Sequence, residues 1–150
     1  MVSFLIAYAS WSGNTEEVAE LIEETLHQEG MNVTKHRIGG GGPIPNPGEY
    51  DAMLIGSFTW DQGATPDEVK DFVADIGYKP EPVYVFGTGD TQFGGDLLFC
   101  NAAVKLARFY QSAVAPLRIE QSPRGVQESK VMEWSKGVLE HWRHLHELKC

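Results

Sequence analysis

Long apolar runs, basic residues and cysteines are all scarce in this chain of 150 residues. The apolar run near its beginning, residues 4–8, is far shorter than the roughly 20 residues that a membrane span needs. No basic segment precedes this run, so we expect a cytoplasmic protein with neither a membrane anchor nor a secretory signal. Cys100 and Cys150 have neither metal-site spacing nor the number expected of a disulfide framework. We interpret them as a buried apolar residue and a terminal thiol.

Lysine and arginine total 12 against 21 aspartates and glutamates, which gives a formal net charge of −9. The excess is concentrated in residues 49–96, where ten acidic residues accompany only Lys70 and Lys79. Nucleic-acid affinity rests on clustered basic residues, so we expect no nucleic-acid partner. The hydrophobic content of 42% is that of a folded globule, and the length fits a single domain over residues 1–150.

Hydrophobic periodicity predicts strands and helices in alternation, without a linker or an internal repeat. Strands are expected over residues 2–8, 32–37, 52–55, 83–86 and 114–119. Helices are expected from residue 16 to Gly30, from a capping box at Thr65-Pro66-Asp67-Glu68, over Leu97 to Tyr110, and along a last stripe of Val131, Trp134, Val138, Trp142 and Leu145. Residues 39–48, with five glycines and three prolines, predict a loop. The alternation predicts a doubly wound α/β/α sandwich around five parallel strands.

Ligands of such sheets bind beyond the carboxyl ends of the strands, so the loops after the first, third and fourth strands are the candidate site. The first loop joins a strand to a helix N-terminus, where free amides favour an anion. It lacks the lysine and the glycine spacing of a Walker loop, which argues against a nucleoside triphosphatase. The alternative is ordinary helix capping, with Asn14 and Glu17 as a local pair. The loop comprises Ser10, Trp11, Ser12, Gly13, Asn14 and Thr15.

The other two loops add an aromatic plate and a glycine-rich slot. Trp60 follows a buried strand, which favours a stacking surface, and the alternative is that it folds back on Pro66. The loop after the fourth strand contains four glycines, which allow close backbone approach to a flat ligand, and the alternative is a plain flexible loop. The candidate residues are Thr59, Trp60, Asp61, Gln62 and Gly63 in one loop and Thr88, Gly89, Asp90 and Phe93 in the other.

Taken together, the three loops resemble those of the short-chain flavodoxins, and the resemblance covers nearly the whole chain. Ser10-x-Ser12-Gly13-Asn14-Thr15 matches the phosphate loop of that family. Thr59-Trp60 matches the loop whose threonine reaches the phosphate and whose tryptophan stacks on the isoalloxazine, and Thr88-Gly89-Asp90 matches the loop that meets the ring edge. The resemblance implies strand order 2-1-3-4-5 and FMN as the cofactor.

The chain departs from the family pattern at two positions. The usual tyrosine on the outer ring face has no clean equivalent, and Phe93 is the nearest aromatic residue. Asp61 stands where many members have glycine, and the family's peptide reorientation on reduction should cost more with aspartate there. Trp11 is expected either on a docking surface or as a lid over the phosphate.

The resemblance implies an electron carrier, not an enzyme: a monomer that takes one electron at a time from a flavin- or NADPH-dependent reductase and delivers it to redox enzymes with basic patches. Nearby acids, above all Asp61 and Asp90, should repel the negative charge of a reduced flavin and keep its potential low. The five histidines are expected away from the three loops. His141, His144 and His146 are interpreted as a solvated helix end, not as metal ligands.

Two kinds of alternative remain at this stage. One is an enzyme on the same scaffold, either a flavin-dependent quinone or azo reductase or a flavoprotein that activates a ribonucleotide reductase. Short loops leave little room for the substrate pocket that a quinone reductase needs. The other is a flavin-free module of response-regulator type, which requires an acidic cluster after the first strand. Tyr8-Ala9-Ser10 supplies no acid at that point.

Overall fold

The computed structural model describes residues 2–10, 13–40, 42–59, 65–89, 100–120 and 123–148. Side chains are described up to residue 145. In chain order the elements are β1 (Ser3–Tyr8), α1 (Asn14–Gln28), β2 (Asn32–Arg37), the 3₁₀ turn η1 (Pro47–Glu49), β3 (Ala52–Phe58), α2 (Asp67–Ile76), β4 (Val83–Gly89), α4 (Asn101–Tyr110), β5 (Leu117–Glu120) and α5 (Val126–Leu148).

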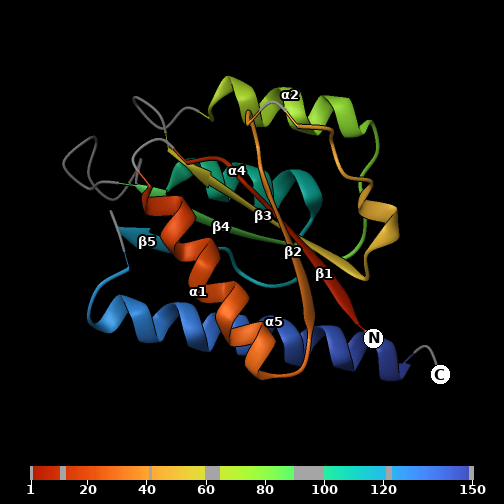
Figure 1. The fold of residues 1–150 in the computed structure, drawn as a ribbon, viewed down its shortest axis with the longest axis vertical. Helices are drawn as coiled ribbons and strands as arrows, with labels where there is room; N and C mark the ends of the chain where they lie inside the picture. Colours follow the sequence, from red (N-terminus) through yellow and green to blue (C-terminus); the bar gives the residue numbers. More distant parts are fainter. Residues whose placement is uncertain are drawn as a thin grey trace.

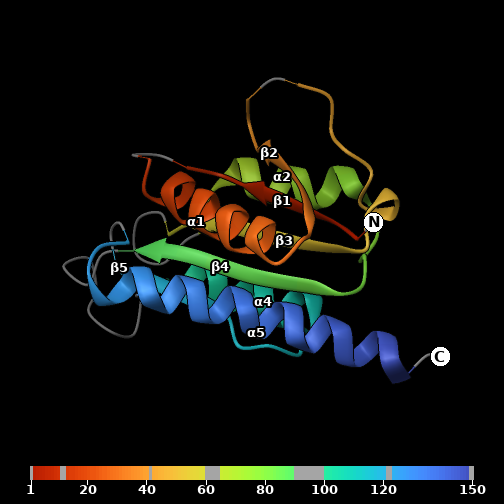
Figure 2. The same cartoon turned by 60° about the horizontal axis from the view of Figure 1, so that its bottom comes forward.

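The strands form one parallel sheet in the order β2-β1-β3-β4-β5, as predicted. Helices α1 and α5 cover one face of the sheet, and α2 and α4 cover the other (Figures 1 and 2). The chain is therefore doubly wound in three layers. Because all strands run in the same direction, their carboxyl ends share one edge, on the left in Figure 1.

The sheet separates two apolar cores. Alternate residues of β1, beginning with Phe4, pack toward α1 and α5, while those beginning with Leu5 pack toward α2 and α4. Both sets are buried, because the strand is covered on both faces. This double burial explains why the central strands have continuous apolar runs instead of an alternating pattern.

The edge strand β2 has a different pattern because only part of it is covered. Its odd-numbered residues turn toward α1: Val33 packs on the core there, and the Lys35 ammonium lies 3.3 Å from the Glu23 carboxylate. His36 turns the other way and stacks on Phe72 of α2, with ring centroids 5.8 Å apart. Burial of the His36 imidazole lowers its pKa below the usual value.

Several element boundaries differ from the predictions: β3 and β4 each extend three residues further than predicted, and α4 begins at Asn101 instead of Leu97. The capping box at Thr65 is wrong: α2 begins at Asp67, Pro66 is its N-cap, and no side-chain hydrogen bond is formed by that cap. The strand predicted from Val114 begins only at Leu117. Pro116 has no N–H to donate to the sheet, so the ladder starts after it. A short 3₁₀ turn, Pro47–Glu49, also lies at the end of the predicted loop over residues 39–48.

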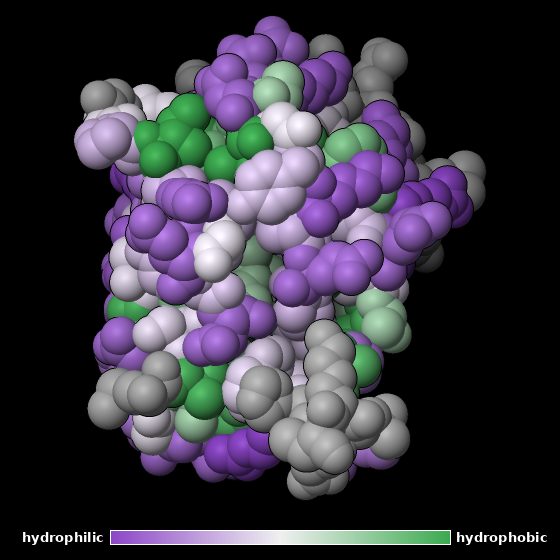
Figure 3. Space-filling view, turned by 90° about the vertical axis from the view of Figure 1, so that its right-hand side faces the viewer, coloured by the Kyte–Doolittle hydropathy of each residue, from purple (hydrophilic) through white to green (hydrophobic). Residues whose placement is uncertain are grey.

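The end of the molecule opposite the carboxyl edge is mostly hydrophilic, with small, separate apolar patches (Figure 3). Among the described residues, the large hydrophobic side chains with substantial exposure are Ile44, Tyr78, Phe109 and Val126. The Lys79 ammonium lies 4.3 Å from the ring centroid of Phe109 and partly covers it. None of the helices in the described ranges combines the length and the apolar character that crossing a membrane would require.

Two glycine positions provide a paired test of the packing. A Cβ added at Gly56 in β3 would collide with the Phe86 ring, whereas a Cβ at Gly137 in α5 would meet open space. Gly56→Ala should therefore lower the free energy of unfolding by about 1–3 kcal/mol through overpacking. Gly137→Ala should raise it by about 0.5–1 kcal/mol, because alanine favours a helix interior. Urea denaturation measures both effects, and a Gly56→Ala protein as stable as the parent would contradict this packing.

Candidate functional site

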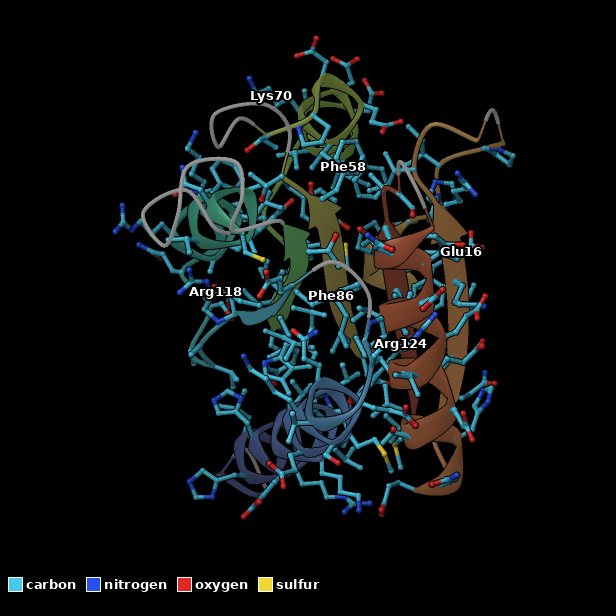
Figure 4. All side chains as sticks on the ribbon, turned by 90° about the vertical axis from the view of Figure 1, so that its left-hand side faces the viewer. Glu16, Phe58, Lys70, Phe86, Arg118 and Arg124 are labelled. Atoms are coloured by element: carbon cyan, nitrogen blue, oxygen red, sulfur yellow. The ribbon has the colours of Figure 1, made fainter. Side chains whose placement is uncertain are left out.

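The segments that follow β1, β3 and β4 are held together where these strands end. The Ala9 amide donates to the Gly56 carbonyl at 3.0 Å, and the Thr59 amide donates to the Thr88 carbonyl at 3.0 Å. Figure 4 looks onto this edge and shows the beginning of α1, marked by Glu16, beside the strand ends. The three loops predicted to form a site therefore leave the sheet at one edge.

Helix α1 begins with amides available to a ligand. Gly13 precedes the helix with φ +92°, a left-handed conformation that suits glycine. The Ser10 hydroxyl accepts hydrogen bonds from the amides of Gly13 at 3.1 Å and Glu16 at 3.4 Å. Within the described residues, no acceptor is found for the amides of Asn14 and Thr15. Two amides at a positive helix terminus fit an anion.

Two buried hydroxyls connect the start of α1 with the end of β4. The Oγ1 atoms of Thr15 and Thr88 lie 2.8 Å apart, and both side chains are buried. One hydroxyl donates to the other, so the second keeps a proton that it can donate elsewhere. Thr59, at the end of β3, accepts a hydrogen bond from the Ala102 amide at 3.3 Å and so anchors the first turn of α4. Amides and hydroxyl protons are donors, which is the chemistry that a phosphate group requires.

The alternative of a local capping pair between Asn14 and Glu17 is wrong. Asn14 is the first residue of the helix, and its N-cap, Gly13, has no side chain to cap with. The Glu17 carboxylate instead accepts hydrogen bonds from both terminal nitrogens of Arg124, at 2.6 Å and 3.3 Å. Figure 4 shows Arg124 beside α1. The hydrogen bond that Arg124 donates to Glu17, followed by the negative charge of Glu17, raises the pKa of Arg124 above its usual value.

A second arginine reaches the site from the end of β2. Arg37 donates from Nη1 to the Glu16 carboxylate at 3.0 Å and from Nη2 to the Ser10 carbonyl at 3.3 Å. The Tyr8 hydroxyl donates to the same Glu16 oxygen at 3.3 Å. Burial, followed by the charge of Glu16, raises the pKa of Tyr8, so this hydroxyl stays protonated.

The sequence pattern of the loops predicts neither arginine at the site, because Arg37 and Arg124 both lie outside the loops. A signal existed for Arg37: it is the last residue of a predicted edge strand, and a parallel strand beside β1 must end near the loop that follows β1. Arg124 is separated from Glu17 by more than a hundred positions. No local pattern could pair these two residues.

The structure thus brings together the described members of the predicted site: Ser10, Gly13, Asn14, Thr15, Thr59, Thr88 and Gly89. Gly89 ends β4 and pairs with Glu120 of β5. The remaining predicted residues lie outside the described ranges: Trp11, Ser12, Trp60, Asp61, Gln62, Gly63, Asp90 and Phe93. The phosphate end of the predicted site is therefore described, and the residues predicted to contact the ring are largely outside the description.

Two other reactive side chains, Cys100 and His141, are committed to contacts with the packed strands. The Cys100 thiol is fully buried and lies 3.6 Å from the carbonyls of Gly87 and Ile119. Burial raises its pKa to about 12, which keeps it a thiol, as expected of an apolar residue. The His141 imidazole bonds to the Tyr84 hydroxyl at 2.9 Å on the α5 side. Within the described ranges, no group of three or more His, Cys, Asp and Glu side chains is placed to hold a metal ion.

Comparison with known proteins gives a consistent result. The family model for flavodoxin matches residues 6–134. Probable flavodoxin 2 of Bacillus subtilis (strain 168) is 31% identical over 144 residues, which cover 91% of this chain and 93% of that protein.

Solved structures agree with the sequence matches. Oxidised flavodoxin 2 from Bacillus cereus superposes with a TM-score of 0.80 at 31% identity, over 93% of this chain and 99% of that one. Fusobacterium nucleatum flavodoxin bound to flavin mononucleotide shares the fold, with a TM-score of 0.75 at 13% identity over 94% of this chain and 99% of its own. With a family model over most of its length and a relative above 30% identity across nearly all of it, this chain belongs to the flavodoxin family.

Proposed function

We propose that this protein is a low-potential one-electron carrier that works with non-covalently bound FMN. The observation that carries the proposal is the meeting of the α1 amides with the Thr15–Thr88 hydroxyl pair at the carboxyl edge of the sheet. These groups are all hydrogen-bond donors and suit the phosphate of a mononucleotide. Membership of the flavodoxin family supports FMN as that mononucleotide.

Four described residues, Ser10, Asn14, Thr15 and Thr88, would take part in holding such a cofactor. The amides of Asn14 and Thr15 would face the phosphate, with the positive end of the α1 dipole behind them. The Thr15–Thr88 pair would donate its remaining hydroxyl proton, and Ser10 fixes the turn through the two amides that it accepts. FMN, when bound, supplies a ring that can take up and release electrons singly.

The residues outside the described ranges complete the proposal through their match to the family pattern. Trp60 would stack on one face of the ring, and Phe93 would cover the other. The backbone from Thr88 to Asp90 would meet the ring edge. Negative charge at Asp61 and Asp90 would oppose reduction of the ring and so lower its potential.

The charge distribution indicates the class of partner. The net charge is −9, and ten acidic residues lie within residues 49–96. Complementary proteins would be redox enzymes with basic patches around their own cofactors, reached by weak and rapidly exchanging contacts. A flavin- or NADPH-dependent reductase would supply the electrons. The protein itself would turn over no substrate.

Replacing Thr15 tests the phosphate site. Thr15→Val removes one hydroxyl of the buried pair while keeping the side-chain shape, and it should weaken FMN binding by about tenfold or more, because a hydrogen bond to a charged group is worth about 1.5–3 kcal/mol. Thr25→Val is the matched control: Thr25 is also buried in α1, but its hydroxyl donates to the Leu21 carbonyl. Quenching of flavin fluorescence measures both affinities. Equal affinities in the two variants would refute this assignment.

Ionic strength tests the role of the acidic surface. The rate at which the reduced, FMN-loaded protein reduces a basic acceptor such as cytochrome c should fall steeply between about 0.05 and 0.3 M salt, as screening shortens the range of attraction. Reduction of an uncharged quinone should change little over the same range. A salt-independent rate with cytochrome c would exclude electrostatic docking. Sustained NADPH oxidation by the loaded protein with a quinone, without any reductase, would identify an enzyme instead of a carrier.

A further inference from the structure

We propose that Arg37 is a positioning residue for the phosphate of FMN: it ties Ser10 to the first turn of α1 and thereby sets the preference for FMN over riboflavin. This inference rests on the proposed function and assigns a part of it to the edge strand β2. Among the described residues, the Arg37 side chain donates hydrogen bonds to Ser10 and Glu16. It acts through Ser10 and Glu16.

The backbone of Arg37 is fixed by the sheet. Arg37 pairs with Tyr8 in the parallel register of β1 and β2, and the Ile38 amide continues the ladder to the Tyr8 carbonyl at 2.7 Å. Strand alternation places Lys35 and Arg37 on the side that faces α1, where each meets a glutamate of that helix. The position of Arg37 in β2 therefore places its guanidinium at the start of α1.

Two acceptors hold the guanidinium in one orientation. Nη1 donates to Glu16, which belongs to α1, and Nη2 donates to the Ser10 carbonyl, which follows β1. The Ser10 hydroxyl in turn accepts from the amides of Gly13 and Glu16. Arg37 and Ser10 thus fix the spacing between the end of β1 and the helix start. A planar fork can bond both acceptors at once, whereas a lysine ammonium is a single point.

The two arginines also offset negative charge at the start of α1. Glu16 and Glu17 both lie in the first turn of α1, where they would repel a phosphate dianion. Arg37 pairs with Glu16, and Arg124 pairs with Glu17. The Arg37 and Glu16 side chains are 52% and 34% exposed, so their ion pair adds little to global stability. Loss of Arg37 should therefore leave the protein folded and affect the turn.

Arg124 offers a control that separates position from charge. Its side chain is 69% exposed and pairs with the neighbouring glutamate at the same helix terminus. Its described backbone contact is with the carbonyl of Pro123, beside it in the chain, and not with Ser10. Arg124→Gln thus removes the same charge from the start of α1 while leaving the tie between Ser10 and Glu16 in place.

The experiment measures dissociation constants of FMN and riboflavin for the parent protein, Arg37→Gln, Arg37→Lys and Arg124→Gln, with flavin fluorescence as the readout. The ratio of the riboflavin constant to the FMN constant reports the contribution of the phosphate. This ratio should fall by about tenfold in Arg37→Gln and by nearly as much in Arg37→Lys, because a misplaced turn loses preorganised donors. Arg124→Gln should lower this ratio by much less, because it changes the charge beside the helix start but keeps the contacts of Arg37 with Ser10 and Glu16.

Other results would overturn the inference in distinguishable ways. An equal fall in Arg37→Gln and Arg124→Gln, with Arg37→Lys unchanged, would mean that charge alone matters. Equal weakening of FMN and riboflavin in Arg37→Gln would mean that Arg37 only supports the fold. An unchanged ratio in Arg37→Gln would deny it any role. A parent protein that does not prefer FMN to riboflavin would remove the proposed phosphate site itself, and the inference with it.

Discussion

The structure depends above all on the burial of β1 in the middle of the molecule. This strand hydrogen-bonds to β2 and β3 on its two sides and is covered by helices on both faces. A strand held in this way must be apolar throughout and must run parallel to neighbours reached through crossover connections. The last residue of β1 and the residue that follows it are consequently held from both sides: the Ile38 amide donates to the Tyr8 carbonyl, and the Ala9 amide donates to the Gly56 carbonyl. The position of these residues sets the position of the phosphate end of the predicted site. That end comprises Gly13, the start of α1, and the Thr15–Thr88 hydroxyl pair that joins α1 to β4.

The parts of this architecture that a sequence can predict are those with a repeated pattern. Buried strands and amphipathic helices can be predicted from the spacing of their apolar residues. The gathering of three loops at one edge follows from the parallel direction of the strands. The predicted start of β5 at Val114 is wrong because residues 114 and 115 are apolar but precede Pro116. Proline has no N–H to donate to the hydrogen-bond ladder of the sheet. The predicted start of α2 is wrong for a similar reason. Thr65 and Glu68 have the spacing of a capping box, yet the N-cap of the helix is Pro66 and not Thr65. Boundaries depend on single hydrogen bonds, which composition does not encode.

The candidate site also contains residues that a local sequence pattern does not predict. Hydroxyl and amide residues in the first loop were identifiable because they are contiguous, whereas the basic residues that serve this loop come from β2 and from the segment before α5. Arg37 reaches the loop through strand register, and Arg124 reaches it through the packing of α5 beside α1. A search for a lysine or arginine inside the loop correctly argues against a Walker motif. It says nothing about cations that the tertiary structure brings in.

The ion pairs among the described residues are concentrated on one helix. The three ion pairs formed among the described residues all involve glutamates of α1: Glu16 with Arg37, Glu17 with Arg124, and Glu23 with Lys35. By contrast, the described acidic residues between 49 and 81 form no ion pair with another described residue. Two basic side chains, Arg37 and Arg124, are thus placed where a bound phosphate would otherwise meet like charge, and the described acids between 49 and 81 have no such partner among the described residues. Under the proposed function, the net value of −9 therefore combines two opposite requirements: near-neutrality where an anionic cofactor would bind, and negative charge where a basic partner would approach.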